Sequence, residues 1–249
     1  MKHIIVCRVN IPRELDPTNH VRPAPYKDPE WNRKRVYLLD AYTRKSLRNQ
    51  TCQDFDFVTL WGPQYGDIGK PLPQEITQIL TREWNTFDSE AFDFERWRAG
   101  KKLKKDTMDF AGQVKYLLRQ MYKDYPGPFL ITNIDSDDAL KYNFVERIQR
   151  AAPDYVHKAP YFLDVVERYL VHLETGGKGV KKRRTASPMV STVEKEIECY
   201  PLKYHHSMLH EHINGTKIPG LYALQTVGDT NILTQGTGKN TTFEVEDFL

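Results

Sequence analysis

Three short apolar segments constrain the fold of this chain more than any other feature. Residues 3–9, 56–61 and 129–134 are each apolar and rich in β-branched or aromatic residues, as buried strands are. Between the first two lies a helical pattern at 35–49, whose inward stripe is Val36, Leu39, Thr43 and Leu47. A strand, a helix and a strand in this order predict a right-handed parallel crossover and therefore an α/β fold.

The rest of the chain supplies further expected elements. Residues 11–31 contain five prolines, which predicts a long loop without regular structure. Helices are expected over about 75–84, 110–122 and 138–150 because their apolar residues recur at helical spacing. β segments are expected at 161–166 and 168–173, and a basic loop at 176–184.

Composition narrows the class of protein. The 36 Lys and Arg against 33 Asp and Glu give a net charge of only +3, so nucleic acid is not an expected partner. No apolar run approaches the ~20 residues that a membrane helix needs. Three widely spaced cysteines fit neither a disulfide framework nor a Cys-based zinc site. We therefore expect a cytoplasmic protein without a membrane span.

Three acids follow the third apolar segment directly. Asp135 and Asp137 are two residues apart, so in extended backbone their side chains would point the same way. Ligands in open α/β sheets bind beyond the carboxyl ends of strands, and Mg²⁺ or Mn²⁺ prefers such carboxylate ligands, completed by phosphate oxygens and water. We therefore predict a divalent metal site at Asp135 and Asp137. One of the acids, most simply Asp138, is expected to cap the helix that follows.

Several phrases of the sequence resemble one family. The chain is similar to the GT-A glycosyltransferases, particularly their rhamnosyltransferase group, in the phrases CRVN (7–10), QTCQDFDF (50–57), NIDSDDAL (133–140), SPMVSTVE (187–194) and HSM (206–208). The resemblance implies transfer of a sugar from a nucleoside diphosphate donor to a hydroxyl of a glycan or other acceptor, with inversion. It also implies a GT-A-like, mostly parallel central sheet flanked by helices, with a mixed acceptor-side half.

On this interpretation residues 1–150 form a nucleotide-sugar-binding half and residues 151–249 an acceptor-side half of the same domain. Arg8 and Asn10, at the end of the first strand, are expected beside the nucleotide, together with Asp135. For Arg8 a surface salt bridge is an equal alternative. Lys115 and Arg119, four apart on one helix face, would reach phosphate or form a solvated face.

Two further residues are expected to complete the site. Glu194 is predicted to be the general base that takes the acceptor proton, with Glu196 and Glu198 as alternatives and a solvated acidic edge as the structural alternative. His206 is predicted to be an additional metal or diphosphate ligand, with His205 and His210 as rivals and a packed structural histidine as the structural alternative. A non-catalytic nucleotide-binding or scaffold domain with a GT-A-like fold is the alternative function.

Overall fold

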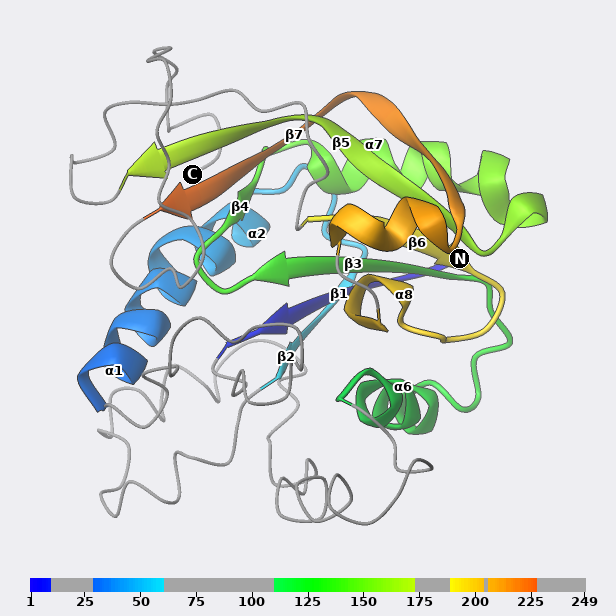
Figure 1. Ribbon diagram of the computed structural model, residues 1–249, viewed down its shortest axis with the longest axis horizontal. Helices are drawn as coiled ribbons and strands as arrows, with labels where there is room; N and C mark the ends of the chain where they lie inside the picture. Colours follow the sequence, from blue (N-terminus) through cyan, green and yellow to red (C-terminus); the bar gives the residue numbers. More distant parts are fainter. Residues whose placement is uncertain (10–28, 61–109, 173–188, 204–205, 228–249) are drawn as a thin grey trace.

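The computed structural model describes residues 1–9, 29–60, 110–172, 189–203 and 206–227 (Figure 1). Most of the expected proline-rich loop, the helix expected at 75–84 and the basic loop at 176–184 lie outside the described residues. The strands are β1 (Lys2–Arg8), β2 (Asp56–Leu60), β3 (Phe129–Asp135), β4 (Ala139–Leu140), β5 (Tyr161–His172), β6 (Ser191–Glu194) and β7 (Asn214–Val227). The helices are α1 (Pro29–Leu38), η3 (Leu39–Arg44), α2 (Lys45–Arg48), α6 (Phe110–Met121), α7 (Phe144–Ala151), η5 (Ala152–Lys158), α8 (Tyr200–Lys203) and η7 (His206–Glu211).

The described strands form one sheet in the order β2-β1-β3-β6-β5-β7-β4. β1 lies between β2 and β3 and is parallel to both. The helical segment from α1 to α2 connects β1 to β2, so the predicted strand–helix–strand crossover is confirmed. Strands from both parts of the sequence, before and after residue 150, contribute to this sheet.

The other side of the sheet is mixed. β6 is antiparallel to β3 and to β5, and β4 is antiparallel to β7, whereas β5 and β7 run parallel. The α/β class with flanking helices is confirmed. β1, β2, β3, β5 and β7 run in one direction and β6 and β4 run in the other, so the described sheet is mixed but most of its strands are parallel, as expected. A strand's own residues indicate that it is buried, whereas its direction is set by its partners across the sheet.

Alternation along the strands places two apolar cores on the two faces of the sheet. From β1, Ile5 and Cys7 enter one core and Ile4 and Val6 enter the other. The first core is covered by α1, η3, α2 and α7, and the second by α6 and α8. The sheet is therefore buried between two helical layers, as expected from the apolar sequences of its first three strands.

The first helical segment starts earlier than predicted. α1 begins at Pro29, six residues before the expected start, and continues through η3 and α2 to Arg48. Proline is compatible with the first turn of a helix because the N–H that it lacks has no intrahelical partner there. The central part of this segment, η3, is a π-helix.

The helix expected to begin at residue 138 starts later, so this prediction is wrong at its first residues. Residues 139–140 form β4, which pairs with Leu224 and Ala223 of β7, and the helix α7 begins only at Phe144. Residues more than 80 positions away supply the hydrogen bonds that keep this segment extended. Its local pattern therefore gave no indication of the strand. The expected helix at 110–122 is confirmed as α6.

A buried polar chain crosses the sheet at its amino end. His3 of β1 contacts Thr132 of β3 (Nε2 to Oγ1, 2.9 Å), and Thr132 contacts Ser191 of β6 (Oγ1 to Oγ, 2.6 Å). On its other side, His3 Nδ1 lies 3.2 Å from Gln149 Nε2. Burial lowers the pKa of His3 to about 3, against a weaker opposing effect of Asp56. The imidazole is therefore neutral in the folded protein.

This histidine predicts a specific loss of stability in acid. Below pH 6.5 the unfolded chain protonates His3 and the folded protein does not until pH 3, so His3 lowers the free energy of unfolding by about 1.4 kcal/mol per pH unit in that window. Urea denaturation of the wild type and His3→Gln between pH 7 and pH 4 measures the difference in slope. Parallel pH profiles for the two proteins would contradict the prediction.

Candidate functional site

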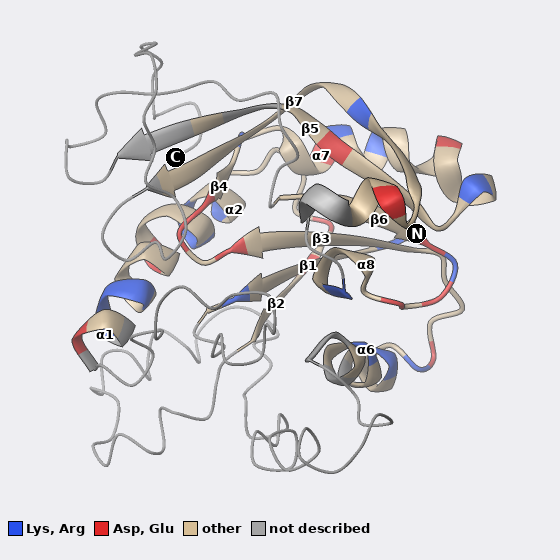
Figure 2. Cartoon of the chain, in the orientation of Figure 1, with Lys and Arg blue, Asp and Glu red and all other residues tan. Residues whose placement is uncertain are grey.

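The carboxyl ends of β1 and β3 meet where the order of connection in the sheet reverses. From β1 the chain passes to β2 on one side and then to β3 on the other. The register pairs Arg8, the last residue of β1, with Asp135, the last residue of β3. Such a switch point is where open α/β sheets form a ligand crevice. Figure 2 shows basic and acidic residues together at these strand ends.

Arg8 and Asp135 form an ion pair at this point. Arg8 Nη2 donates to Asp135 Oδ1 at 3.0 Å, and the side chains are 42% and 31% exposed. The structure therefore brings together two of the predicted donor-binding residues. Asn10, the third, lies outside the described residues.

The three acids lie in a tight turn rather than in an extended strand. We call residues 135–138 the acid turn; in it, the N–H of Asp138 donates to the carbonyl of Asp135 at 3.1 Å. β3 ends at Asp135, so the alternation that would have pointed Asp135 and Asp137 the same way stops there. Asp137 instead turns toward α1, and this corrects the basis of the two-carboxylate prediction.

Arg35 of α1 binds two side chains of the acid turn. Its two terminal nitrogens contact Asp137, Nη1 to Oδ2 at 2.8 Å and Nη2 to Oδ1 at 3.1 Å, and Nη2 also donates to Ser136 Oγ. The side chains of Arg35 and Asp137 are only 10% and 4% exposed. Burial alone would lower the pKa of Arg35, but the charge and hydrogen bonding of Asp137 outweigh it and raise that pKa above its ordinary value.

Thr43 of the π-helix η3 binds two backbone carbonyls of the acid turn. Its hydroxyl donates to the carbonyl of Asp138 at 2.8 Å and lies 3.2 Å from the carbonyl of Asp135. π-Helical turns are frequent beside functional sites because they redirect side chains from the regular helical path. Arg35 and Thr43 together leave the acid turn little freedom to move.

Asp138 ties the acid turn to the last described strand. Its Oδ1 accepts from the N–H of Thr226 in β7 at 3.2 Å, so it binds a strand and does not cap a helix as predicted. Burial raises the pKa of Asp138 well above its ordinary value, and the charges of Asp137 and Asp135 raise it further. The protonated form of Asp138 is therefore favoured in the folded protein.

The arrangement fits a divalent cation at one carboxylate. Asp135 reaches solvent and, together with diphosphate oxygens and water, would give the one-carboxylate set in which Mg²⁺ and Mn²⁺ are often held. Asp137 does not fit as a ligand here because both of its oxygens face Arg35. Among the described residues, no group of three His, Cys, Asp or Glu side chains is arranged to hold a metal ion.

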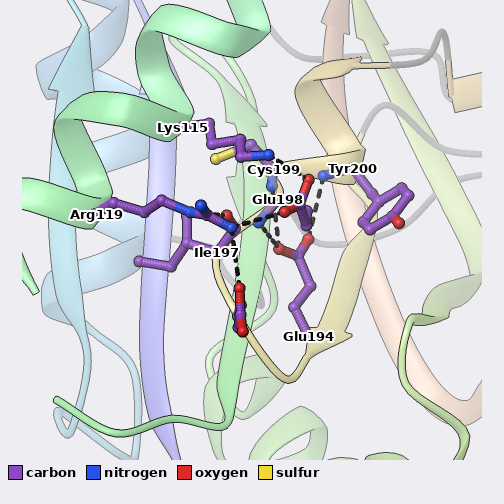
Figure 3. Close-up of polar contacts among 8 residues, drawn as sticks. Lys115, Arg119, Glu194, Ile197, Glu198, Cys199 and Tyr200 are labelled. Atoms are coloured by element: carbon purple, nitrogen blue, oxygen red, sulfur yellow. Dashed lines mark hydrogen bonds and ion pairs between the residues drawn. The ribbon is translucent and has the colours of Figure 1, made fainter. Parts of the chain in front are cut away.

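Glu194, the predicted base, lies at the opposite end of β3. The register pairs it with Phe129, six residues from Asp135, or about 20 Å along the strand. Figure 3 shows its carboxylate accepting three backbone N–H groups, those of Glu198 (2.6 Å), Cys199 (3.0 Å) and Tyr200 (3.1 Å). Thr192 Oγ1 donates to it as well, at 2.5 Å. The structure does not bring Glu194 to the acid turn.

This carboxylate has a structural role. Glu194 is buried, and burial raises its pKa while the hydrogen bonds from Thr192 and from the backbone oppose that rise. By binding three successive N–H groups, it closes the loop between β6 and α8. Sequence spacing alone did not distinguish such a structural carboxylate from a catalytic one.

The alternative bases are held beside Glu194 by α6. Glu198 contacts Lys115 (2.6 Å) and Arg119 (2.7 Å), as Figure 3 shows. Glu196 contacts Arg119 at 3.2 Å. Lys115 and Arg119 therefore pair with carboxylates in this structure and do not form a plain solvated face. Their contacts attach α6 to the β6–α8 loop. Their contact with phosphate stays a prediction.

The remaining predicted ligand is His206. It is the first residue of η7, and the position of its side chain is outside what the structure describes. Of its neighbours in the sequence, His210 is exposed. The metal prediction for His206 stays a prediction.

Sequence reasoning did not select Arg35 and Thr43 as site residues. Thr43 stood on the inward stripe of the helical pattern, and Arg35 lies four residues before Leu39 of the same stripe. Polar residues at inward positions of a helix that follows the first strand were the available signal. Their partners in the acid turn lie about 90 to 100 residues away, beyond any local pattern.

Comparisons with known proteins leave the family open. No protein-family model matches this chain, and no curated protein matches it. None of the described helices is long and apolar enough to cross a membrane.

The two acids paired with arginines should respond differently to neutralisation. Asp137→Asn leaves the buried guanidinium of Arg35 without its carboxylate, so the free energy of unfolding should fall by about 3–5 kcal/mol. Asp135→Asn breaks a half-exposed pair and should cost about 1 kcal/mol or less. Urea denaturation measures both, and equal losses would argue against the buried anchor.

Glu194 should matter for stability. Glu194→Gln keeps the size of the side chain but replaces one acceptor oxygen with a donor, so at least about 2 kcal/mol of unfolding free energy should be lost. Glu196→Gln, at a side chain 80% exposed, is the matched control and should change stability by about 1 kcal/mol or less. Thermal and urea denaturation test this, and a Glu194→Gln protein of unchanged stability would refute the assigned role.

Proposed function

We propose that this protein is a glycosyltransferase that transfers a sugar from a nucleoside diphosphate donor to an acceptor hydroxyl. The observation that carries the proposal is the solvent-reaching Arg8–Asp135 pair at the switch point of the sheet. Behind it, Arg35 and Thr43 hold the acid turn rigidly. The resemblance to GT-A enzymes in the phrase NIDSDDAL supports the same assignment.

The donor would bind through complementary charges. Arg8 offers a guanidinium to the diphosphate, and Asp135 offers a carboxylate that would hold Mn²⁺ or Mg²⁺ against the same phosphates. The cation would neutralise the negative charge that develops on the departing diphosphate. Preorganisation of the turn by Arg35 and Thr43 would spare the protein a rearrangement during transfer.

The acceptor, a glycan or another hydroxyl compound, must lose a proton to a base. Glu194 is not part of this proposal, because both of its oxygens accept hydrogen bonds at the other end of β3. Glu196 and Glu198 are paired with α6 instead. Inversion at the sugar carbon remains an expectation from the resemblance.

A nucleotide-binding or scaffold domain without catalysis is the second candidate. The structural use of Glu194 favours it, since the residue expected to act as the base serves another purpose. Release of nucleoside diphosphate in the presence of an acceptor, but not in its absence, separates an enzyme from a binding domain.

Metal-dependent nucleotide binding tests the donor site directly. A nucleoside diphosphate at 100 times its Kd should stabilise the wild type by about 2.7 kcal/mol when Mn²⁺ is present, because only the folded state binds it. Asp135→Asn should abolish this gain, whereas Glu196→Gln, distant from the acid turn, should retain it. Thermal denaturation with uridine, guanosine and thymidine diphosphates measures the effect. Full stabilisation of the Asp135→Asn variant would place the donor site elsewhere.

A further inference from the structure

The two arginine–aspartate pairs of the acid turn differ in how firmly they are held. Arg35 grips Asp137 with both terminal nitrogens, and neither side chain is more than 10% exposed. Arg8 contacts Asp135 through one nitrogen, and both side chains are more than 30% exposed. A buried two-point pair is costly to break, whereas a half-exposed one-point pair is worth little.

Arg8 also has unused hydrogen-bonding capacity. A guanidinium carries five N–H donors, and within the described part of the chain the Arg8 guanidinium donates only to Asp135. Its Nε is out of contact with solvent and lacks an acceptor among these residues. A buried donor without a partner is unfavourable, so Arg8 gains from an anion that offers more acceptors.

We propose that Arg8 is an exchangeable counter-ion. In the free protein it neutralises Asp135; when a divalent cation binds Asp135, Arg8 leaves this carboxylate and donates to the diphosphate of the donor. This inference rests on the proposed function, and it adds a second role for Arg8, which weakens cation binding at Asp135 as long as no nucleotide is bound.

The charges explain the exchange. A cation at Asp135 Oδ1 would lie close to Arg8 Nη2, which is 3.0 Å from this oxygen, and the two positive charges would repel each other. A diphosphate removes the conflict because it supplies negative oxygens for both. The cation and the nucleotide therefore bind each more tightly in the presence of the other, and by linkage this coupling is reciprocal.

The exchange predicts effects of opposite sign from one substitution. Arg8→Gln removes the competitor for Asp135, so Mn²⁺ alone should bind about 5-fold more tightly than to the wild type, as expected for loss of one exposed ion pair. The same variant loses a charge-assisted contact to phosphate, so a nucleoside diphosphate at saturating Mn²⁺ should bind about 10- to 100-fold more weakly. Arg8→Lys keeps the charge and should bind Mn²⁺ as the wild type does.

The experiment measures two affinities for each protein. Free Mn²⁺ is followed by electron paramagnetic resonance without nucleotide, and binding of uridine, guanosine and thymidine diphosphates is followed by calorimetry at saturating Mn²⁺. Arg119→Gln is the matched control, because its side chain is 40% exposed and its ion pairs lie at the other end of β3. It should leave both affinities unchanged. Circular dichroism checks that each variant is folded.

The outcomes separate this inference from the proposed function. Unchanged or weaker Mn²⁺ binding by Arg8→Gln overturns the exchange, even if the wild type binds a nucleoside diphosphate with Mn²⁺. A wild type that binds none of the three nucleotides argues against the proposed donor site, and the Mn²⁺ titration still reports whether Arg8 competes for Asp135. A wild type that binds neither Mn²⁺ nor nucleotide overturns both.

Discussion

The buried contact between Arg35 and Asp137 is the interaction on which the candidate site depends. It joins the helix after β1 to the turn after β3, so two strands of the parallel core and their connections share one anchor. Because a planar guanidinium fits a carboxylate at two points, the pair fixes orientation as well as distance. Asp135 can then face solvent with its backbone already held, and the chemistry proposed here needs that fixed position.

The local part of the fold was predictable and the long-range part was not. Apolar runs located β1, β2 and β3, and helical spacing located α6, because burial leaves its period in the sequence. The sequence did not predict β4, because its extended conformation depends on pairing with β7. It did not predict the orientation of Asp137 either, because that depends on the ion pair with Arg35. Where a segment's conformation is fixed by a contact about a hundred residues away, the residue pattern of that segment alone does not predict it.

The same limit applies to function. An acid at the end of a strand can bind a ligand or organise a loop, and residue type does not separate the two. Asp135 ends β3 half exposed at the switch point, whereas Glu194 ends β6 buried among backbone N–H groups. The sequence placed both in a candidate site, and the number of protein donors around each carboxylate now distinguishes them.

The hydrogen bond from Thr226 to Asp138 has a consequence for how the protein is made. The acid turn is synthesised nearly ninety residues before the strand that completes it, because β7 supplies the partner of both Asp138 and β4. During synthesis, β4 and Asp138 lack these partners until β7 has left the ribosome. The acid turn can therefore form all of its contacts only after the last described strand has been synthesised. A chain that ends before residue 226 would keep the parallel strands but would lack the hydrogen bond to Asp138.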